Sequence, residues 1–228
     1  MQARPPSFFE KRVKHIHILS STALEDVKAL ISACSGLVSL TCWSDAFQEG
    51  GLLSVLPTQT LQKLSIKIET LLGITEVNYP KLPAWNFPNL THLELVNPTK
   101  ADAIDWDGLC RLPSLTHLAV GDLVGRGHAH SFLPPLAEVL EKSPRLQLLL
   151  IITEDEPFKE EIRKGALHDG EEVDVQSKRV LCIPYFHWPV GYTEYWKDVR
   201  AEGKDMWAYV EDVRGQVARE VQNVLARD

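Results

Sequence analysis

Several patterns that mark common protein classes are missing from this sequence of 228 residues. No apolar run approaches the roughly 18 residues that a membrane span needs. The first ten residues lack the apolar centre of a signal peptide, and their two prolines disfavour the amphipathic helix of a transit peptide. The four cysteines are separated by 8, 68 and 72 residues and form no C-x-x-C pair. We therefore expect free thiols, a cytoplasmic or nuclear location and no membrane partner.

Basic charge and catalytic motifs are also scarce. A net charge of −7 and a pI near 5.6 argue against nucleic-acid binding, which needs a clustered basic face to displace counterions from phosphates. Gly121, Gly125 and Gly127 are not followed by the Gly-Lys-Ser/Thr of a phosphate-binding loop. His130-Ser131 lies outside any Gly-x-Ser-x-Gly nucleophile elbow. We expect neither enzymatic activity nor a cofactor.

The sequence does contain a hexamer of the form Leu-x-x-Leu-x-aliphatic, which recurs six times with small variations. Its clearest copies are Leu-Thr-His-Leu-Glu-Leu from Leu90 and Leu-Thr-His-Leu-Ala-Val from Leu115. The six copies begin at residues 13, 37, 61, 90, 115 and 146, at steps of 24, 24, 29, 25 and 31. This period is typical of a leucine-rich repeat, in which each unit lays one short parallel strand beside the last. The fold class that we predict is α/β, an irregular leucine-rich-repeat-like solenoid.

Strand geometry assigns a side to each position of the hexamer. The first, fourth and sixth side chains should point into the core, and the third and fifth should lie on an open concave sheet. Such a sheet is the usual recognition surface of a solenoid. The predicted partner-binding residues are its polar side chains: His15, His17, Ser39, Thr41, Lys63, Ser65, His92, Glu94 and His117. The sixth strand offers Leu148 and Leu150 instead, which indicates contact with a flanking segment or a small apolar docking patch.

Between strands the chain must return on the opposite side. A helix start at residues 21–25 and a stop at Gly36 predict one return helix, whose buried face would hold Leu24, Val27, Leu30 and Ile31. Residues 132–142 predict another, with two prolines in its first turn and a buried face of Leu136, Val139 and Leu140. The returns after Ile66 and Leu95 lack a helical period and should be extended or single turns.

After Ile152 the pattern changes. Residues 153–162 are charged and could form another return helix, and residues 178–184 read as a last strand. Asp205 is a good N-cap for a final helix whose apolar stripe comprises Trp207, Val210, Val213, Val217, Val221 and Val224. We expect this helix to cover the exposed end of the array, with partner binding as the alternative. The expected domains are an N-terminal extension at 1–12, the repeat domain at 13–190 and a helical C-terminal cap at 191–228.

His92 and His117 should lie on adjacent strands about 4.8 Å apart. With Glu94 they could offer two nitrogens and one oxygen to a zinc ion, the minimum for an open metal site. No oriented second shell is apparent beside them, so surface histidine is the alternative that we favour. A metal-binding protein or enzyme therefore remains a minor hypothesis.

The repeats, the Arg-Val-Leu-Cys-Ile-Pro run at 179–184 and the Gly-Lys-Asp-Met-Trp run at 203–207 resemble the F-box-associated leucine-rich-repeat-like proteins of mushroom-forming fungi. The resemblance implies target recognition in a ubiquitin ligase, where an N-terminal F-box docks a Skp-type adaptor. No Leu-Pro-x-Glu-type F-box precedes Val13. We expect either an F-box encoded upstream or a free-standing scaffold without a ligase role, and in both cases an unknown target protein as partner.

Overall fold

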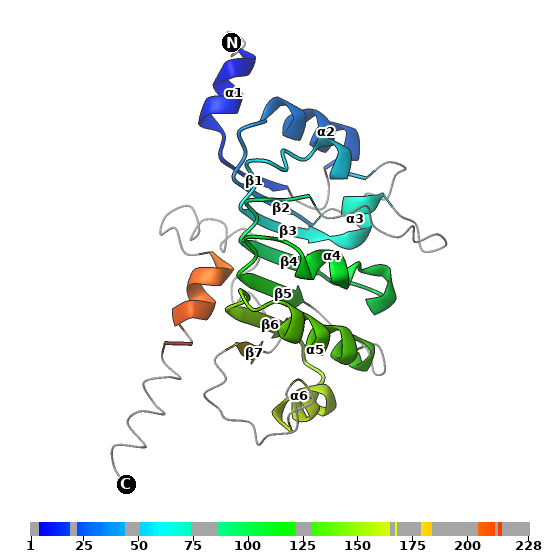
Figure 1. Cartoon of the computed structure of the whole chain (residues 1–228). Helices are drawn as coiled ribbons and strands as arrows, with labels where there is room; N and C mark the ends of the chain where they lie inside the picture. The colour runs from blue at the N-terminus through cyan, green and yellow to red at the C-terminus, as the bar shows by residue number, and fades with distance from the viewer. Residues whose placement is uncertain are drawn as a thin grey trace.

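Seven short strands lie side by side in the order in which they occur in the chain (Figure 1). They form one parallel sheet, in which each strand pairs with the next. The strands are β1 (His15–Ile18), β2 (Ser39–Cys42), β3 (Lys63–Lys67), β4 (His92–Val96), β5 (His117–Gly121), β6 (Leu148–Ile152) and β7 (Val180–Ile183). The structure is a computed structural model that describes residues 5–18, 22–43, 51–73, 86–121, 129–164, 167, 179–183, 205–212 and 214–215.

The pairing register matches the alignment of the six hexamers. The third hexamer position of each strand pairs with the third position of the next, from His15 with Ser39 through to His117 with Leu148. The last strand continues the order, because Leu149 pairs with Val180. The predicted α/β class, the six strand positions and the seventh strand are confirmed, and the assignment to a repeat family stays a prediction.

The first, fourth and sixth positions of the hexamers form the main core. Of these side chains only Val13 is half-buried, and the others are at most 9% exposed. They pack against the buried faces of the return segments in a single apolar cluster. Because each strand is too short to bury its apolar side alone, neighbouring units must stack to complete this core.

Two return segments are helices where the sequence predicts them. In α5 (Leu133–Lys142) the buried residues are Leu136, Val139 and Leu140, as expected. In α2 (Leu24–Ala33) the buried residues are Leu24, Val27 and Ile31, whereas Leu30 is 41% exposed. The inclusion of Leu30 is wrong because it lies about 60° around the helix from Val27, at the edge of the buried face. The helix also begins after Ala23, without a side-chain cap.

The remaining returns are short. After β2 comes the 3-10 turn η1 (Leu53–Val55), and after β3 the helix α3 (Ile68–Leu72). After β4 come η2 (Ala101–Ala103) and α4 (Trp106–Cys110), so the expected short turns are confirmed for this return, while residues 74–85 of the return after Ile66 lie outside the described residues. The turn η3 (Ala129–Phe132) leads into α5, and α6 (Glu156–Arg163) follows β6, where the charged return helix was predicted.

The expected extension at 1–12 contains the helix α1 (Pro6–Arg12), which lies at the β1 end of the sheet (Figure 1). Phe9 packs against the main core. The Lys14 ammonium donates to the carbonyl oxygens of Glu10 and Gly36, at 3.2 and 2.9 Å. A Cβ atom at Gly36 would lie 2.1 Å from the Glu10 carbonyl oxygen, so this turn needs glycine for α1 to approach it.

The return helices α2 to α6 lie along one side of the stacked strands, and a helix at 206–212 lies along the other (Figure 1). We call the face that this helix contacts the front face; it carries the third and fifth hexamer positions. Alternation of buried and partly exposed residues is clear in β1 to β3, but β6 is buried at all five positions. A second apolar layer therefore covers the C-terminal half of the front face.

That position corrects the expectation of an end cap. The described residues 205–212 pack on the broad face of the sheet, because the outward positions of β5 and β6 offer a second apolar surface there. Val213, Val217, Val221 and Val224 of the predicted stripe, and residues 191–204 of the predicted domain, lie outside the part whose side chains are described.

Candidate functional site

The nine predicted partner-binding residues divide into two groups on the front face. His15, His17, Ser39 and Thr41 lie on β1 and β2; His15 is exposed and the other three are half-buried. Lys63, Ser65, His92, Glu94 and His117 lie on β3, β4 and β5. In this second group, Lys63, His92 and His117 contact the chain's own C-terminal helix at Asp205, Trp207 or Glu211.

The twin Leu-Thr-His-Leu motif orients two imidazole rings. The Thr91 hydroxyl donates to the Gln62 carbonyl oxygen at 3.0 Å and lies 2.8 Å from His92 Nδ1. Thr116 repeats the arrangement, with 3.1 Å to the Thr91 carbonyl oxygen and 2.8 Å to His117 Nδ1. A threonine hydroxyl has one proton, which the carbonyl receives, so we assign the Nδ1 proton to both histidines as donor to the threonine oxygen.

Oriented in this way, the two rings stack on each other. The centroids of His92 and His117 are 4.2 Å apart and their planes differ by 10°. The Trp207 indole meets both rings at steep angles, with centroid distances of 5.1 Å to His92 and 5.7 Å to His117. Edge-to-face contact of this kind is a favoured geometry for aromatic rings. We call Lys63 and the two stacked histidines the platform.

Asp205 anchors the start of the C-terminal helix in two ways. One carboxylate oxygen accepts from the Ala208 amide at 3.0 Å, which confirms the predicted N-cap. The other lies 2.6 Å from the Lys63 ammonium of β3. Both side chains are about a third exposed, at 38% and 28%, so the ion pair is partly screened by solvent.

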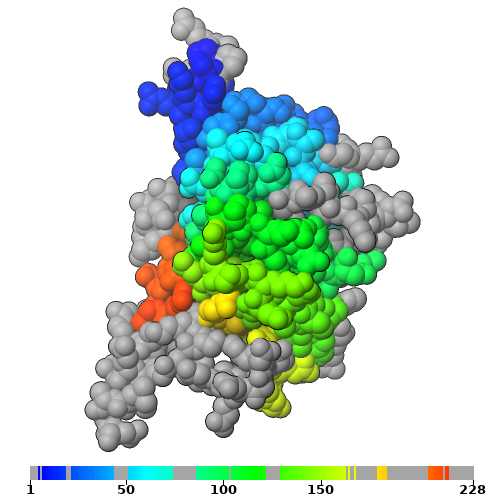
Figure 2. Space-filling view, in the orientation of Figure 1, coloured from blue at the N-terminus to red at the C-terminus, as the bar shows by residue number. Residues whose placement is uncertain are grey.

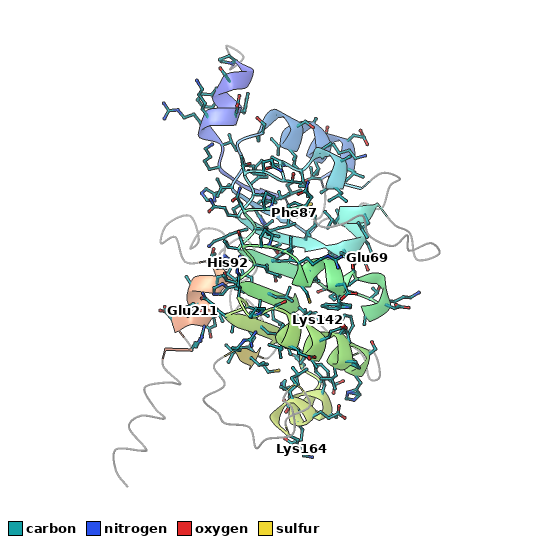
Figure 3. All side chains as sticks on the ribbon, in the orientation of Figure 1. Glu69, Phe87, His92, Lys142, Lys164 and Glu211 are labelled. Carbon is teal, nitrogen blue, oxygen red and sulfur yellow. The ribbon has the colours of Figure 1, made fainter. Side chains whose placement is uncertain are left out.

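The Glu211 carboxylate lies one and a half turns further along the same helix, near the histidine platform (Figure 3). Its Oε1 atom is 3.4 Å from His117 Nε2 and 3.1 Å from Arg214 Nη1. With the neutral tautomer assigned above, Nε2 and the carboxylate are both acceptors, so the contact with His117 is attractive only when the ring is protonated.

An apolar floor adjoins the platform. Its members on β5, β6 and β7 are Ala119, Leu148, Leu150, Ile152 and Ile183, and Met206, Trp207 and Val210 cover them from the helix. Figure 2 shows the helical segment resting against these strands. The contact between Leu148, Leu150 and a flanking segment, one of the two expectations for this end of the sheet, is confirmed.

A third polar group lies beside the platform. The Trp43 indole donates to Ser65 Oγ at 2.7 Å, and the Ser65 hydroxyl donates to the Glu94 carboxylate. Trp43 also meets His17 edge to face, with ring centroids 5.7 Å apart. This group joins β1, β2, β3 and β4 across the front face and holds Glu94 in a buried position.

Burial dominates the electrostatics of these residues. Loss of hydration lowers the pKa of His92 from 6.5 to about 4, assisted by the neighbouring His117 and Lys63. Burial also lowers the pKa of His117, although Glu211 acts in the opposite direction. The pKa of Glu94 is raised by burial from 4.5 to about 7, with the Ser65 hydrogen bond opposing the change. At neutral pH the two stacked rings are therefore neutral, and Lys63 is the platform's permanent charge.

Perturbed titratable groups of this kind often mark catalytic sites. Here Trp207 occupies the position over both rings where a substrate would make contact. The Ser65 hydroxyl donates to a carboxylate rather than to a histidine base, so no nucleophile and base are paired at this site. Within the described ranges, no group of three histidine, cysteine or acidic residues is arranged to hold a metal ion.

Sequence reasoning missed four contributors to the site. Trp207 was identified only as part of an apolar stripe, and the threonines at 91 and 116 were not assigned a role. Their signal was present, since threonine precedes histidine in both copies of the motif. The role of Trp43 in holding Ser65 carried no comparable signal, because it depends on the conformation of the chain after β2.

The helices in the described ranges include none with the length and apolar character of a membrane span. In comparisons with known proteins, no protein-family model matches the chain, and no curated protein shows significant similarity to it.

Proposed function

We propose that this chain is an irregular leucine-rich-repeat-like solenoid that acts as a protein-protein interaction module. The observation that carries the proposal is the helix at 206–212, which docks on the front face through an ion pair, an aromatic contact and an apolar cluster. A face that holds one helix from its own chain has the chemistry to recognise a helix. The in-register order of the strands supports the solenoid assignment.

The front face of β1 and β2 lies beyond β3 to β7, the strands that the described side chains of residues 205–212 contact. His15 is exposed there, and Ser39 and Thr41 are accessible in part. Hydroxyl and imidazole groups at alternate strand positions offer donors and acceptors in a flat array. We propose that a partner protein makes its first contacts at this end.

Affinity capture followed by mass spectrometry tests the proposal when it is run on matched variants. Ser39→Arg places a large charge on the front face, and Ser32→Arg places the same charge on an exposed position of α2. We expect a protein that the wild type and Ser32→Arg capture and Ser39→Arg does not, with direct binding of the purified pair as confirmation. Capture that is insensitive to Ser39→Arg would contradict the proposal.

By its resemblance to the fungal F-box-associated proteins, the module would select targets for a ubiquitin ligase. The resemblance rests on the hexamers and on two short C-terminal runs, of which residues 179–183 and 205–207 are described. An F-box in the genomic sequence upstream of Met1, together with capture of a Skp-type adaptor by the longer product, would support this role. A partner that is captured without an adaptor would favour the free-standing scaffold.

A further inference from the structure

The docking site of the C-terminal helix has three parts in a fixed order. Asp205 pairs with Lys63, Trp207 covers the stacked rings of His92 and His117, and Val210 is buried on the apolar floor. The spacing i, i+2 and i+5 runs from the helix N-cap to the start of its second turn. These three parts define what a helix must present in order to fit this face.

Charge on the two sides is complementary at the start of the helix, where the Asp205 carboxylate lies 2.6 Å from the Lys63 ammonium. The two imidazoles beside Lys63 are neutral at neutral pH, and Glu211 pairs with Arg214 of its own helix. A helix with a carboxylate at its N-cap is therefore favoured at this site over one that begins with a neutral or basic residue.

Few side chains hold the helix in place. Among its described residues, Met206, Trp207 and Val210 are buried, while Tyr209 is 48% exposed and the Glu211 side chain is 47% exposed. The ion pair to Lys63 is open to solvent on one side, and the Glu211 contact depends on protonation of His117. A segment held by three apolar anchors can be displaced by a partner that offers the same anchors and additional ones.

We propose that residues 205–212 act as a built-in competitor, and that the partner presents a helix with the same order of side chains. Its N-cap carboxylate would face Lys63, an aromatic ring two residues on would cover the histidine pair, and an aliphatic residue at the sixth position would enter the apolar floor. This inference rests on the proposed function and adds the class of partner and the means of its control.

The test uses the purified full chain and a fluorescent synthetic peptide of residues 203–228 as the probe, with anisotropy as the readout. Trp207→Ala in the chain removes the central anchor of the intramolecular helix and leaves the platform intact. We expect this variant to bind the probe at least tenfold more tightly than the wild type does. Leu30→Ala, which truncates an exposed apolar side chain on α2, should bind like the wild type.

A second variant keeps the inference testable if Trp207→Ala does not fold. Asp205→Asn keeps an effective N-cap and removes the charge that faces Lys63. Asp212→Asn removes a charge from an exposed position of the same helix and is its control. We expect stronger probe binding by Asp205→Asn than by Asp212→Asn, and loss of binding when Lys63→Met is added to Trp207→Ala.

Equal probe affinities for the wild type, Trp207→Ala and Asp205→Asn, with all three folded by circular dichroism, would overturn the inference and make the helix a permanent part of the fold. Probe binding that persists after Lys63→Met would overturn it as well. If the wild type forms dimers that the free probe dissociates, the helix that occupies this face comes from a second copy of the chain and not from a separate partner. That result would also overturn the inference. None of these outcomes bears on capture of a partner through Ser39, which tests the proposed function separately.

Discussion

Replacement of Glu94 by glutamine should make the protein more stable at neutral and higher pH. The carboxyl group is 8% exposed, and burial raises its pKa from 4.5 to about 7. The folded state therefore favours the protonated form. The stability that this group contributes is fully present below pH 4.5 and is lost as the pH rises through about 7.

The size of the effect follows from the pKa change. At about 1.36 kcal/mol per pKa unit, moving from 4.5 to about 7 corresponds to about 3 kcal/mol of unfolding free energy. Glutamine has the shape of glutamic acid and retains an oxygen that can accept from Ser65, so Glu94→Gln should remove the pH-dependent part and little else. We expect the variant to exceed the wild type by about 2–3 kcal/mol at pH 8.5 and by much less at pH 5.

His92 has the opposite effect on the dependence of the unfolding free energy on pH. Its pKa is lowered from 6.5 to about 4, so the stability that it contributes is present above pH 6.5 and is lost as the pH falls through about 4. Between pH 4.5 and 6.5 the effects of Glu94 and His92 oppose each other in the wild type, and the lowered pKa of His117 acts in the same direction as that of His92, so the stability of the wild type should rise with pH less steeply than that of Glu94→Gln. In Glu94→Gln no carboxylate opposes the effect of His92, so the free energy of unfolding should rise with pH over that interval.

Urea unfolding followed by tryptophan fluorescence, at intervals from pH 4.5 to pH 8.5, measures both curves. Glu141→Gln removes an exposed carboxylate on α5 and should follow the wild type throughout. A stability difference between Glu94→Gln and the wild type that is the same at pH 5 and pH 8.5 would refute the reasoning, because it would show that Glu94 titrates alike in the folded and unfolded chains.

Three further substitutions test the packing. Leu93→Ala, at a fully buried strand position, should lower the free energy of unfolding by about 2–5 kcal/mol, while Leu30→Ala on the exposed edge of α2 should have little effect; equal effects in urea unfolding would show that the strand faces are misassigned. Arg179 donates to the carbonyl oxygens of Leu140, Ser143 and Leu146, and Arg179→Lys, which lacks the planar fork, should cost about 1–3 kcal/mol in the same assay. Arg145→Lys is the control, and equal losses would argue against a special role for the fork. Gly36→Ala should displace α1, because the added methyl group would collide with the Glu10 carbonyl oxygen, and should therefore speed tryptic cleavage after Arg12. An unchanged digestion pattern would mean that α1 keeps its position without the close contact at Gly36.

The strands could be predicted because their signal is local and repeated. A six-residue pattern that recurs six times constrains both the position and the mutual register of the strands, and any shift by one residue would turn the leucines outward. The return helix at 133–142 was equally predictable from the sequence, since two prolines mark its start and its apolar residues share one face. Leu30 shows the limit of that reading, because periodicity alone does not give the width of the buried face.

The site was harder to predict from the sequence than the strands were. The stripe of Trp207 and Val210 indicates that one side of a helix is buried, but it does not say against which surface. The surface is set by the outward positions of β5 and β6, whose apolar character was visible without indicating its occupant. The spacing of His92 and His117 predicted that they are neighbours. Their stacking depends on the threonine hydroxyls and the indole above them, which are tertiary contacts.

The uneven cover of the front face has a consequence for how such a chain can change over time. One and the same hexamer position is exposed at His15, half-buried at His92 and fully enclosed at Leu148. Substitutions are tolerated more readily at accessible positions than at enclosed ones. Variation among related chains should therefore concentrate on β1 and β2, while β5 and β6 keep small or aliphatic residues, so that the surface at one end of the sheet can change without loss of the helix docked at the other.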